Sequence, residues 1–185
     1  MKPTRQRKPA REQKLGRSQP LVGVVMGSDT DLPVMSEAVK TLQEFGIPFE
    51  VEVTSAHRSP QRTHEYAHTA AERGLKVIIV GAGGASHLAG VVAAETILPV
   101  IAVPVVTTPL GGLDALYSTV QMPGGIPVGV MAVDKPGARN AAIYAAEILA
   151  TADGALAERL RRHKEELARS VEEKSARVKQ QFESP

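Results

Sequence analysis

Short runs of β-branched and other apolar residues alternate with helix-length amphipathic segments from Leu21 onward. This alternation is typical of a parallel sheet built from βαβ units. The predicted strands are Leu21–Met26, Phe49–Thr54, Val77–Ala82, Val100–Val103 and Val128–Val133. Three of these are near-continuous apolar runs, as expected for strands that helices cover on both faces.

Start signals for helices follow the first two strands. Thr30 or Asp31 can cap a helix that has Pro33 in its first turn, and Ser59 can cap one that begins at Pro60.

Glycines mark the ends of the same two helices. We expect the first helix to end at Phe45-Gly46 and the second at Arg73-Gly74, because glycine adopts the left-handed conformation that ends many helices. Five strands with this alternation predict an α/β fold: a three-layer, flavodoxin-like, doubly wound parallel sheet with strand order 2-1-3-4-5.

The C-terminal segment, residues 153–185, has the pattern of one long polar helix with a narrow apolar stripe. The stripe consists of Leu156, Leu160, Leu167, Val171, Val178 and Phe182. Its repeat of eleven keeps the apolar side chains aligned along a nearly straight helix. Because so narrow a stripe cannot form its own core, we expect an intersubunit helix that crosses another subunit or pairs with its own copy. The alternative is a solvated tail beyond about Ser170.

Composition limits the chain to one globular domain with tails. It has 185 residues, of which 43% are hydrophobic, and it contains no cysteine. Disulfides, thiolate metal sites and a cysteine nucleophile are therefore excluded. No apolar run approaches the roughly 20 residues of a membrane helix, so we expect no membrane partner.

The positive charge is concentrated at the N-terminus. Residues 1–20 contain seven lysines and arginines and one acidic residue, Glu12, whereas the whole chain has a net charge of only +2. The remaining body is therefore acidic, and with 3% aromatic residues it offers few stacking surfaces for bases. We expect residues 1–20 to be a disordered basic arm, residues 21–152 to be the catalytic domain, and the protein to be cytoplasmic with no nucleic-acid partner.

Polar and glycine-rich segments follow the first three predicted strands: Gly27–Asp31, Ser55–Pro60 and Gly81–His87. In an open parallel sheet, ligands bind beyond the carboxyl ends of the strands where the strand order reverses. The order 2-1-3 makes these three loops neighbours. We therefore expect them to form one binding site.

The first two loops carry groups suited to a phosphorylated sugar. Ser28 precedes a helix N-terminus, which favours an anion, and Asp31 either accepts hydrogen bonds from sugar hydroxyls or only caps the helix. In the second loop, Ser55 and Arg58 surround His57. Arginine suits bidentate phosphate recognition, and histidine, with an unperturbed pKa of about 6.5, suits proton transfer.

The third loop is rich in small residues. Gly83 and Gly84 allow a flat ligand to approach the backbone, although tight packing explains them equally well. The loop matches a dinucleotide-binding fingerprint poorly, because Ser86 stands where the third glycine or alanine belongs. His87 is either a ligand contact or a side chain beside the helix cap.

The segment from His64 to His68 matches the H-E-x-x-H pattern of zinc proteases. Both histidines would lie on a polar helix face that points to water. Residues 74–90 offer only His87 as a third ligand, so we assign no metal site and expect no metal-dependent hydrolysis.

Four ordered motifs between Val22 and Ala150 carry a resemblance to a known family. They are Val-Met-Gly-Ser-x-x-Asp, Ser-Ala-His-Arg-x-Pro, Gly-Ala-Gly-Gly-Ala-x-His-Leu and Gln-Met-Pro-x-Gly-Ile-Pro-Val. The chain resembles the class I N5-carboxyaminoimidazole ribonucleotide mutases of purine biosynthesis, also called the catalytic subunit of phosphoribosylaminoimidazole carboxylase. Arg58 and the Gly-Gly-Ala-Ser-His segment favour class I over class II, in which Ser-Ala-His-Lys occurs.

The resemblance implies a role for each site residue. Ser28, Ser55 and Arg58 would hold the substrate phosphate, Asp31 the ribose hydroxyls, and Gly83, Gly84 and His87 would lie beside the imidazole and its carboxylate, with His57 as general acid and base. The family moves a carboxylate from the exocyclic nitrogen to C4 of an aminoimidazole ribonucleotide without ATP, metal or organic cofactor, and it forms homo-octamers. A non-catalytic flavodoxin-like nucleotide-binding module is the alternative.

Overall fold

The structure, a computed structural model, describes residues 19–182. Residues 1–18 and 183–185 lie outside it, and with them most of the predicted basic arm and the end of the predicted C-terminal segment. Within the described part, Gln19 already contacts the body, since its side-chain amide donates a hydrogen bond to the carbonyl of Arg73.

Five parallel strands form one sheet in the order β2-β1-β3-β4-β5, as predicted. Their bounds are Val22–Met26 (β1), Phe49–Val53 (β2), Val77–Gly83 (β3), Val100–Val105 (β4) and Gly129–Val130 (β5). Val22 is aligned with both Phe49 and Val77, so β1, β2 and β3 begin level with one another. The loops that follow these strands therefore leave the sheet at the same edge.

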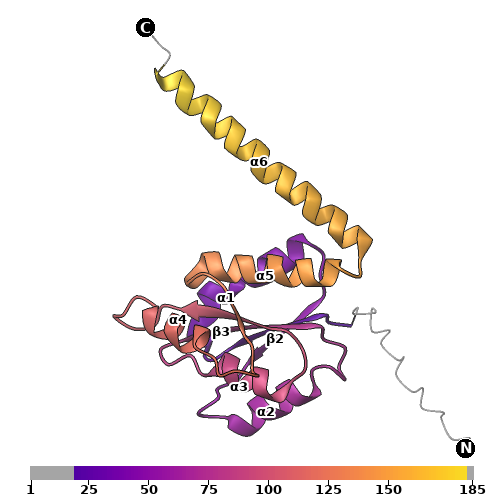
Figure 1. Ribbon diagram of the computed structural model, residues 1–185, viewed down its shortest axis with the longest axis vertical. Helices are drawn as coiled ribbons and strands as arrows, with labels where there is room; N and C mark the ends of the chain where they lie inside the picture. Colours follow the sequence, from indigo (N-terminus) through magenta and orange to yellow (C-terminus); the bar gives the residue numbers. More distant parts are fainter. Residues whose placement is uncertain (1–18, 183–185) are drawn as a thin grey trace, which may run out of the picture.

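Helices cover both faces of the sheet (Figure 1). The helices are α1 (Leu32–Glu44), α2 (Pro60–Thr69), α3 (Leu88–Glu95), α4 (Leu113–Val120), α5 (Asp134–Ala150) and α6 (Gly154–Phe182), with a 3-10 turn at Asp29–Asp31. α1 and α5 lie on one face, and α2 and α3 lie on the other. The fold is thus the expected three-layer arrangement.

The apolar side chains of the central strands alternate between two cores. Val24 and Ile79 point to the core under α1 and α5, whereas Val25 and Ile78 point to the core over α2 and α3. All four are fully buried. Burial on both faces explains why these strands are apolar throughout their length.

The two strands beyond β3 differ from the sequence prediction. β4 continues through Pro104 to Val105, because its neighbour β5 pairs only with Ile101 and Ala102 and needs no N–H from the proline. β5 itself has two residues instead of the six predicted for Val128–Val133. After a last hydrogen bond from Met131 to β4, the chain turns away towards α5.

Helix boundaries were predicted well at the N-termini and less well at one C-terminus. α1 ends where expected, with Gly46 in the left-handed conformation after Phe45. α2 ends at Thr69, earlier than Arg73-Gly74. Hydrogen-bonded turns continue from Ala70 to Gly74, and Gly74 has the positive φ that was expected of a glycine at this position.

The long C-terminal helix is present as α6, and it extends well beyond the body (Figure 1). Leu156 and Leu160 are buried against the domain. The other four stripe residues, Leu167, Val171, Val178 and Phe182, are exposed in the single chain. Among residues 19–182, no helix is both long and apolar enough to cross a membrane.

Candidate active site

Three loops at the carboxyl ends of β1, β2 and β3 enclose one cavity of about 460 Å³. Seven of the eight predicted site residues line it: Ser28, Asp31, Ser55, His57, Arg58, Gly83 and His87. Gly84 is the exception. It has a left-handed φ of 60° in the turn after β3 and is not part of the cavity lining.

The first loop folds around its own serine and aspartate. The Ser28 hydroxyl accepts a hydrogen bond from the backbone N–H of Thr30, and the Ser28 N–H donates to Asp31 Oδ2 over 3.1 Å. These two reciprocal hydrogen bonds form a capping box. Ser28, and not Thr30 or Asp31, is therefore the capping side chain of this turn.

Asp31 is the buried carboxylate of the site, with 3% of its surface exposed. Burial raises the pKa of Asp31 above its usual value, and the hydrogen bond from the Ser28 N–H opposes that shift. A buried acceptor at the base of a cavity suits ribose hydroxyl groups.

Arg58 links the second loop to the first. One of its guanidinium nitrogens, Nη2, lies 3.4 Å from the carbonyl oxygen of Gly27, and its own N–H donates to the Ser55 hydroxyl over 3.2 Å. Ser59 stabilises the same turn, since its hydroxyl accepts from the Ser55 N–H over 2.9 Å. Together, Ser28, Ser55 and Arg58 present two hydroxyls and one cation to the cavity, which fits an anion such as phosphate.

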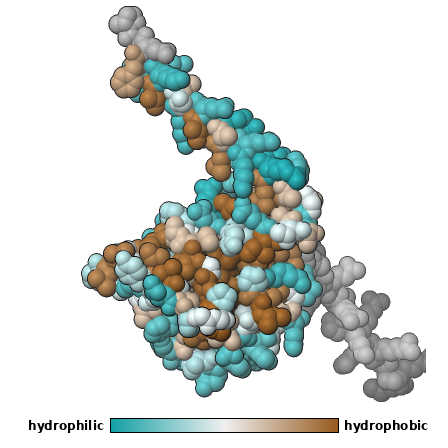
Figure 2. All heavy atoms as spheres, in the orientation of Figure 1, coloured by the Kyte–Doolittle hydropathy of each residue, from teal (hydrophilic) through white to brown (hydrophobic). Residues whose placement is uncertain are grey.

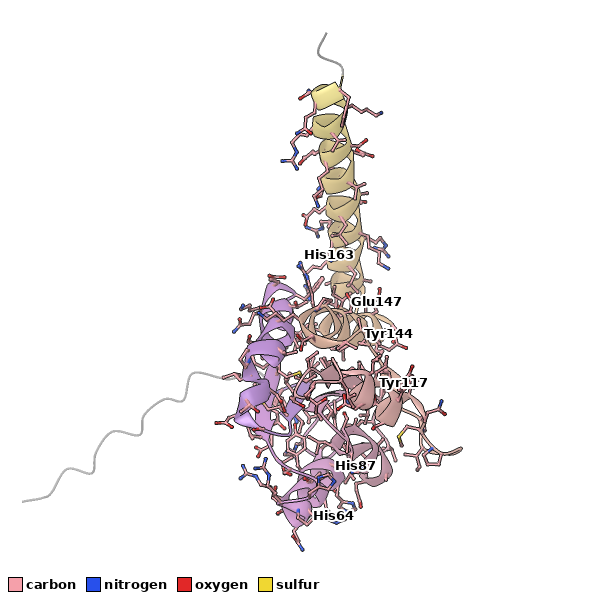
Figure 3. All side chains as sticks on the ribbon, turned by 90° about the vertical axis from the view of Figure 1, so that its left-hand side faces the viewer. His64, His87, Tyr117, Tyr144, Glu147 and His163 are labelled. Atoms are coloured by element: carbon pink, nitrogen blue, oxygen red, sulfur yellow. The ribbon has the colours of Figure 1, made fainter. Side chains whose placement is uncertain are left out.

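The two predicted histidines of the site contact each other. His57 Nε2 and His87 Nδ1 are 2.7 Å apart, and the rings meet edge to face with centroids separated by 4.9 Å. His57 comes from the loop before α2, and His87 stands immediately before α3. Figure 3 shows His87 on the lower part of the domain, far from α6. The contact brings a proton donor and acceptor pair to the cavity.

The third loop is shaped by a second set of close contacts. Ser86 is buried and has a positive φ of 46°, and its hydroxyl donates to the carbonyl of Ala82 over 3.1 Å. Gly83 has no room for a side chain, because an added Cβ would overlap with Thr107. Glycine at this position therefore allows Thr107 to reach the cavity.

Sequence reasoning missed Thr107, which lines the cavity from the loop after β4. Only the loops after the first three strands were considered. The available signal was its position, since Thr107 follows the carboxyl end of a strand that pairs with β3. The remaining lining residues that were not predicted are Gly27, Thr30, Ala56, Ala82, Ala85, Ser86 and Leu88.

A group of possible metal ligands lies outside this cavity. Among residues 19–182, only His64, His68 and Glu95 place three such side chains within reach of one ion. The two histidines are exposed on α2, as expected. The third member comes from α3, beyond the interval 74–90 in which the sequence offered only His87.

Comparisons with known proteins identify relatives of this chain. The family model of AIR carboxylase matches residues 21–170. The N5-carboxyaminoimidazole ribonucleotide mutase of Pyrococcus horikoshii is 53% identical over 161 residues, which cover 87% of this chain and 90% of the relative. The enzyme of the same name from Thermotoga maritima is also 53% identical and covers 87% of this chain and 93% of the relative.

A solved structure supports the same relationship. The crystal structure of Treponema denticola PurE superposes with a TM-score of 0.77 at 28% identity and covers 86% of this chain and 99% of that chain. The resemblance indicated by the four sequence motifs thus extends over residues 21–170. The chain belongs to the AIR carboxylase family.

Proposed function

We propose that this chain is an isomerase that converts N5-carboxyaminoimidazole ribonucleotide to 4-carboxy-5-aminoimidazole ribonucleotide in purine (IMP) biosynthesis. The observation that carries the proposal is the His57–His87 contact at 2.7 Å in a cavity that also presents Ser28, Ser55 and Arg58. The names of the relatives with about half of their residues identical support the same substrate.

Substrate binding begins with the phosphate. The two serine hydroxyls and the Arg58 guanidinium would hold it, while Asp31 accepts hydrogen bonds from the ribose. These contacts leave the imidazole beside the third loop, where the Gly83 backbone and His87 lie next to the ring and its carboxylate. Gly84, which does not line the cavity, acts in this arrangement through the shape of the turn.

The chemistry requires one proton donor that later accepts a proton. His57 donates a proton to the exocyclic nitrogen as its bond to the carboxylate breaks and CO2 is released. C4 of the ring then attacks the CO2, and the proton on C4 returns to His57. Atoms and charges balance over the two steps, so neither an oxidant nor a nucleoside triphosphate is consumed.

Retention of CO2 in the cavity contributes as much to the rate of the proposed reaction as proton transfer does. Positioned general acid–base catalysis supplies about 10²- to 10⁴-fold in rate, and holding a reactant next to its acceptor can supply several further powers of ten. The cavity must therefore close over the ring during the reaction. The Thr107 loop and the third loop flank the position of the ring.

We also propose that the functional unit is a homo-octamer in which α6 contacts another subunit. The exposed stripe residues Leu167, Val171, Val178 and Phe182 support a protein contact, as does a second apolar surface on α4. That surface includes Leu113, Tyr117 and Val120, each more than half exposed. Figure 2 shows apolar residues gathered along α6 and over the α4 side of the body. The expected cytoplasmic location stays a prediction.

The test is an assay with purified protein and two alternative substrates. We expect turnover of N5-carboxyaminoimidazole ribonucleotide and none of aminoimidazole ribonucleotide with bicarbonate. Efficient use of the second pair would assign the chain to a carboxylase instead. Binding of either ribonucleotide without turnover would favour the non-catalytic nucleotide-binding module.

A further inference from the structure

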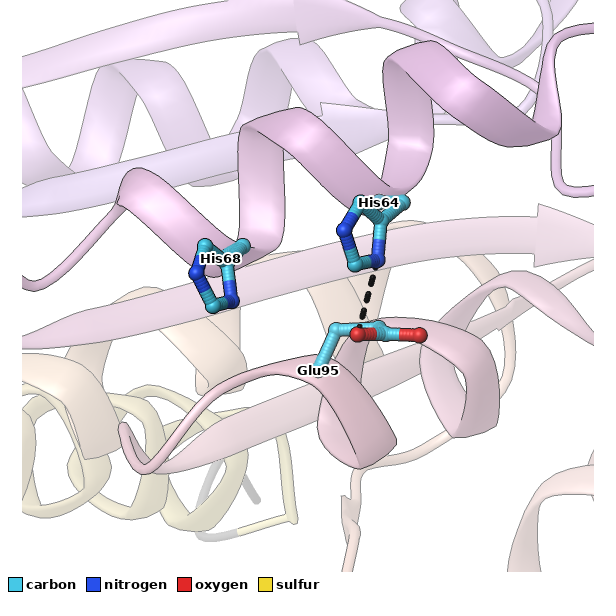
Figure 4. A group of neighbouring side chains, drawn as sticks. All are labelled: His64, His68 and Glu95. Carbon is cyan, nitrogen blue, oxygen red and sulfur yellow. Dashed lines mark ion pairs between the residues drawn. The ribbon is translucent and has the colours of Figure 1, made fainter.

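Two histidines and a glutamate meet on the surface formed by α2 and α3. His64 and His68 lie one helical turn apart on α2, and Glu95 is the last residue of α3 (Figure 4). The ligand atoms of the three side chains all lie within 4.8 Å of one another. None of the three lines the catalytic cavity.

We propose that His64, His68 and Glu95 form a binding site for a divalent first-row transition-metal ion such as Zn²⁺. Imidazole nitrogens together with one carboxylate are typical ligands of Zn²⁺ and its neighbours, whereas Mg²⁺ and Ca²⁺ prefer oxygen ligands alone. A spacing of four residues places both imidazoles on one face of α2. Their rings are stacked, with centroids 5.5 Å apart and an interplanar angle of 14°.

The geometry requires only small side-chain movements. Zinc bonds of about 2.0–2.2 Å place neighbouring ligand atoms about 3–3.5 Å apart. His64 Nδ1 and Glu95 Oε2 are already 2.8 Å apart. The side chains of His64 and Glu95 are 57% and 35% exposed, so an ion can reach them from solvent and their torsions can adjust.

An ordinary surface ion pair accounts for only part of the cluster. A protonated His64 and Glu95 would form such a pair, which contributes at most about 1 kcal/mol. The stacked position of His68 has no role in that pair, whereas a metal ion uses all three side chains. His68 therefore distinguishes the two explanations.

The ion would connect the two helices whose N-terminal ends lie next to the two histidines of the cavity. His57 precedes α2 by three residues, and His87 stands immediately before α3. Metal binding would join the middle and second half of α2 to the C-terminal end of α3, stabilise the folded state and raise its melting temperature. The inferred site thus supports the α2–α3 pair and takes no part in carboxylate transfer.

The experiment uses Co²⁺ as a spectroscopic probe and Zn²⁺ as a competitor on the full-length protein without an affinity tag. We expect one bound Co²⁺ per chain, visible by its d–d absorbance and displaced by Zn²⁺. The variants H68Q and E95Q should each weaken Zn²⁺ binding at least about tenfold and abolish the Zn²⁺-dependent rise in melting temperature. The exposed neighbour Glu65 provides the matched control, since E65Q should bind as the wild type does.

Two results would overturn the proposal. One is that Zn²⁺ binding does not depend on the proposed ligands: H68Q, E95Q and wild type bind Zn²⁺ with the same affinity, or none of the three shows Co²⁺ absorbance. The other is loss of the ion in His57→Asn with retention in H68Q, which would place the metal at the His57–His87 contact. Neither result depends on turnover, so failure here leaves the proposed isomerase activity untouched.

Discussion

His57 Nε2 lies 2.7 Å from His87 Nδ1, and the two imidazole planes are nearly perpendicular, at 86°. In such a contact one ring donates its N–H and the other accepts with a lone pair, so the two facing nitrogens share a single proton. The contact can therefore hold the ring of His57 in one orientation while His57 gives up a proton and takes one back in the proposed reaction. We therefore expect His87 to position His57, the proposed general acid and base.

Replacement of His57 by asparagine should separate catalysis from binding. We expect kcat/KM to fall about 10²- to 10⁴-fold, because the variant has no group that transfers a proton, while the Kd of the ribonucleotide changes only a few-fold. Steady-state kinetics and calorimetry measure the two quantities. His163→Asn on α6 is the control and should keep full activity. Normal turnover by the His57 variant would remove this residue from the mechanism.

Arg58→Lys should weaken ribonucleotide binding about tenfold although the charge is kept, because lysine cannot form a bidentate contact with phosphate. Titration calorimetry with the ribonucleotide and with its dephosphorylated nucleoside checks this, since only the first should respond. Arg62→Lys is the matched control, because Arg62 pairs with Glu52 outside the cavity. Equal losses in the two variants would argue against phosphate at Arg58.

Gly83→Ala should destabilise the fold by about 1–3 kcal/mol and reduce activity, because the new methyl group would displace Thr107. Urea denaturation measures the change in the free energy of unfolding. Gly124→Ala is the control, since nothing lies within 4 Å of a Cβ there, and it should stay within about 0.5 kcal/mol of wild type. Thr107→Ala in the Gly83→Ala background should restore part of the lost stability.

Asp31→Asn should make stability less dependent on pH while it impairs ribonucleotide binding. Because burial raises the pKa of Asp31 in the folded state, the stability that the protonated carboxyl contributes is full below the unfolded pKa of 3.8. It is lost as pH rises through the folded-state pKa. We therefore expect the variant to gain melting temperature relative to wild type as the solution is taken from acid towards neutral pH.

Thermal melting of the ligand-free protein at a series of pH values tests this, with Asp29→Asn at the exposed neighbouring position as control. A gap between wild type and Asp31→Asn that widens towards acid pH would contradict the assignment. Burial thus makes the charge of Asp31 unfavourable for folding, although the same carboxylate accepts the capping hydrogen bond from the Ser28 N–H.

Replacements along α6 should separate folding from assembly. Leu160→Ala should cost about 2–5 kcal/mol, since Leu160 is buried in its own subunit. Val178→Asp should leave the subunit folded but shift the assembly towards smaller species in sedimentation velocity. Lys174→Ala, on the same exposed part of α6, should change neither. An unchanged assembly in Val178→Asp would exclude the outer stripe from the contact.

The parallel sheet could be predicted because the residues of its buried strands are almost all apolar. Val24 and Ile79 are apolar since both faces of β1 and β3 are covered. The length of β5 could not be predicted in the same way. The strand ends where the chain turns away from β4 after Met131 bonds to Ala102, and this tertiary contact has no local signal in the sequence. The site loops were found by their position after strands.

Tertiary contacts without a local signal also explain which residues were missed at the cavity and at the proposed metal site. Thr107 reaches the cavity only because Gly83, 24 positions earlier in the chain, has no side chain. Glu95 reaches His64 because α2 and α3 pack side by side on one face of the sheet. Such meetings depend on helix packing and not on spacing along the sequence.

Because β1, β2 and β3 begin level with one another, the lengths of these strands set where the three loops of the cavity lie. Deletion of a single residue within any of the three strands would draw its loop back by about 3.3 Å and exchange the side chains that face the two cores. Insertions should be less harmful in the loops at the amino ends of the strands, because the cavity lies at the carboxyl ends. The cavity therefore depends on the lengths of the three strands as well as on the residues of the three loops.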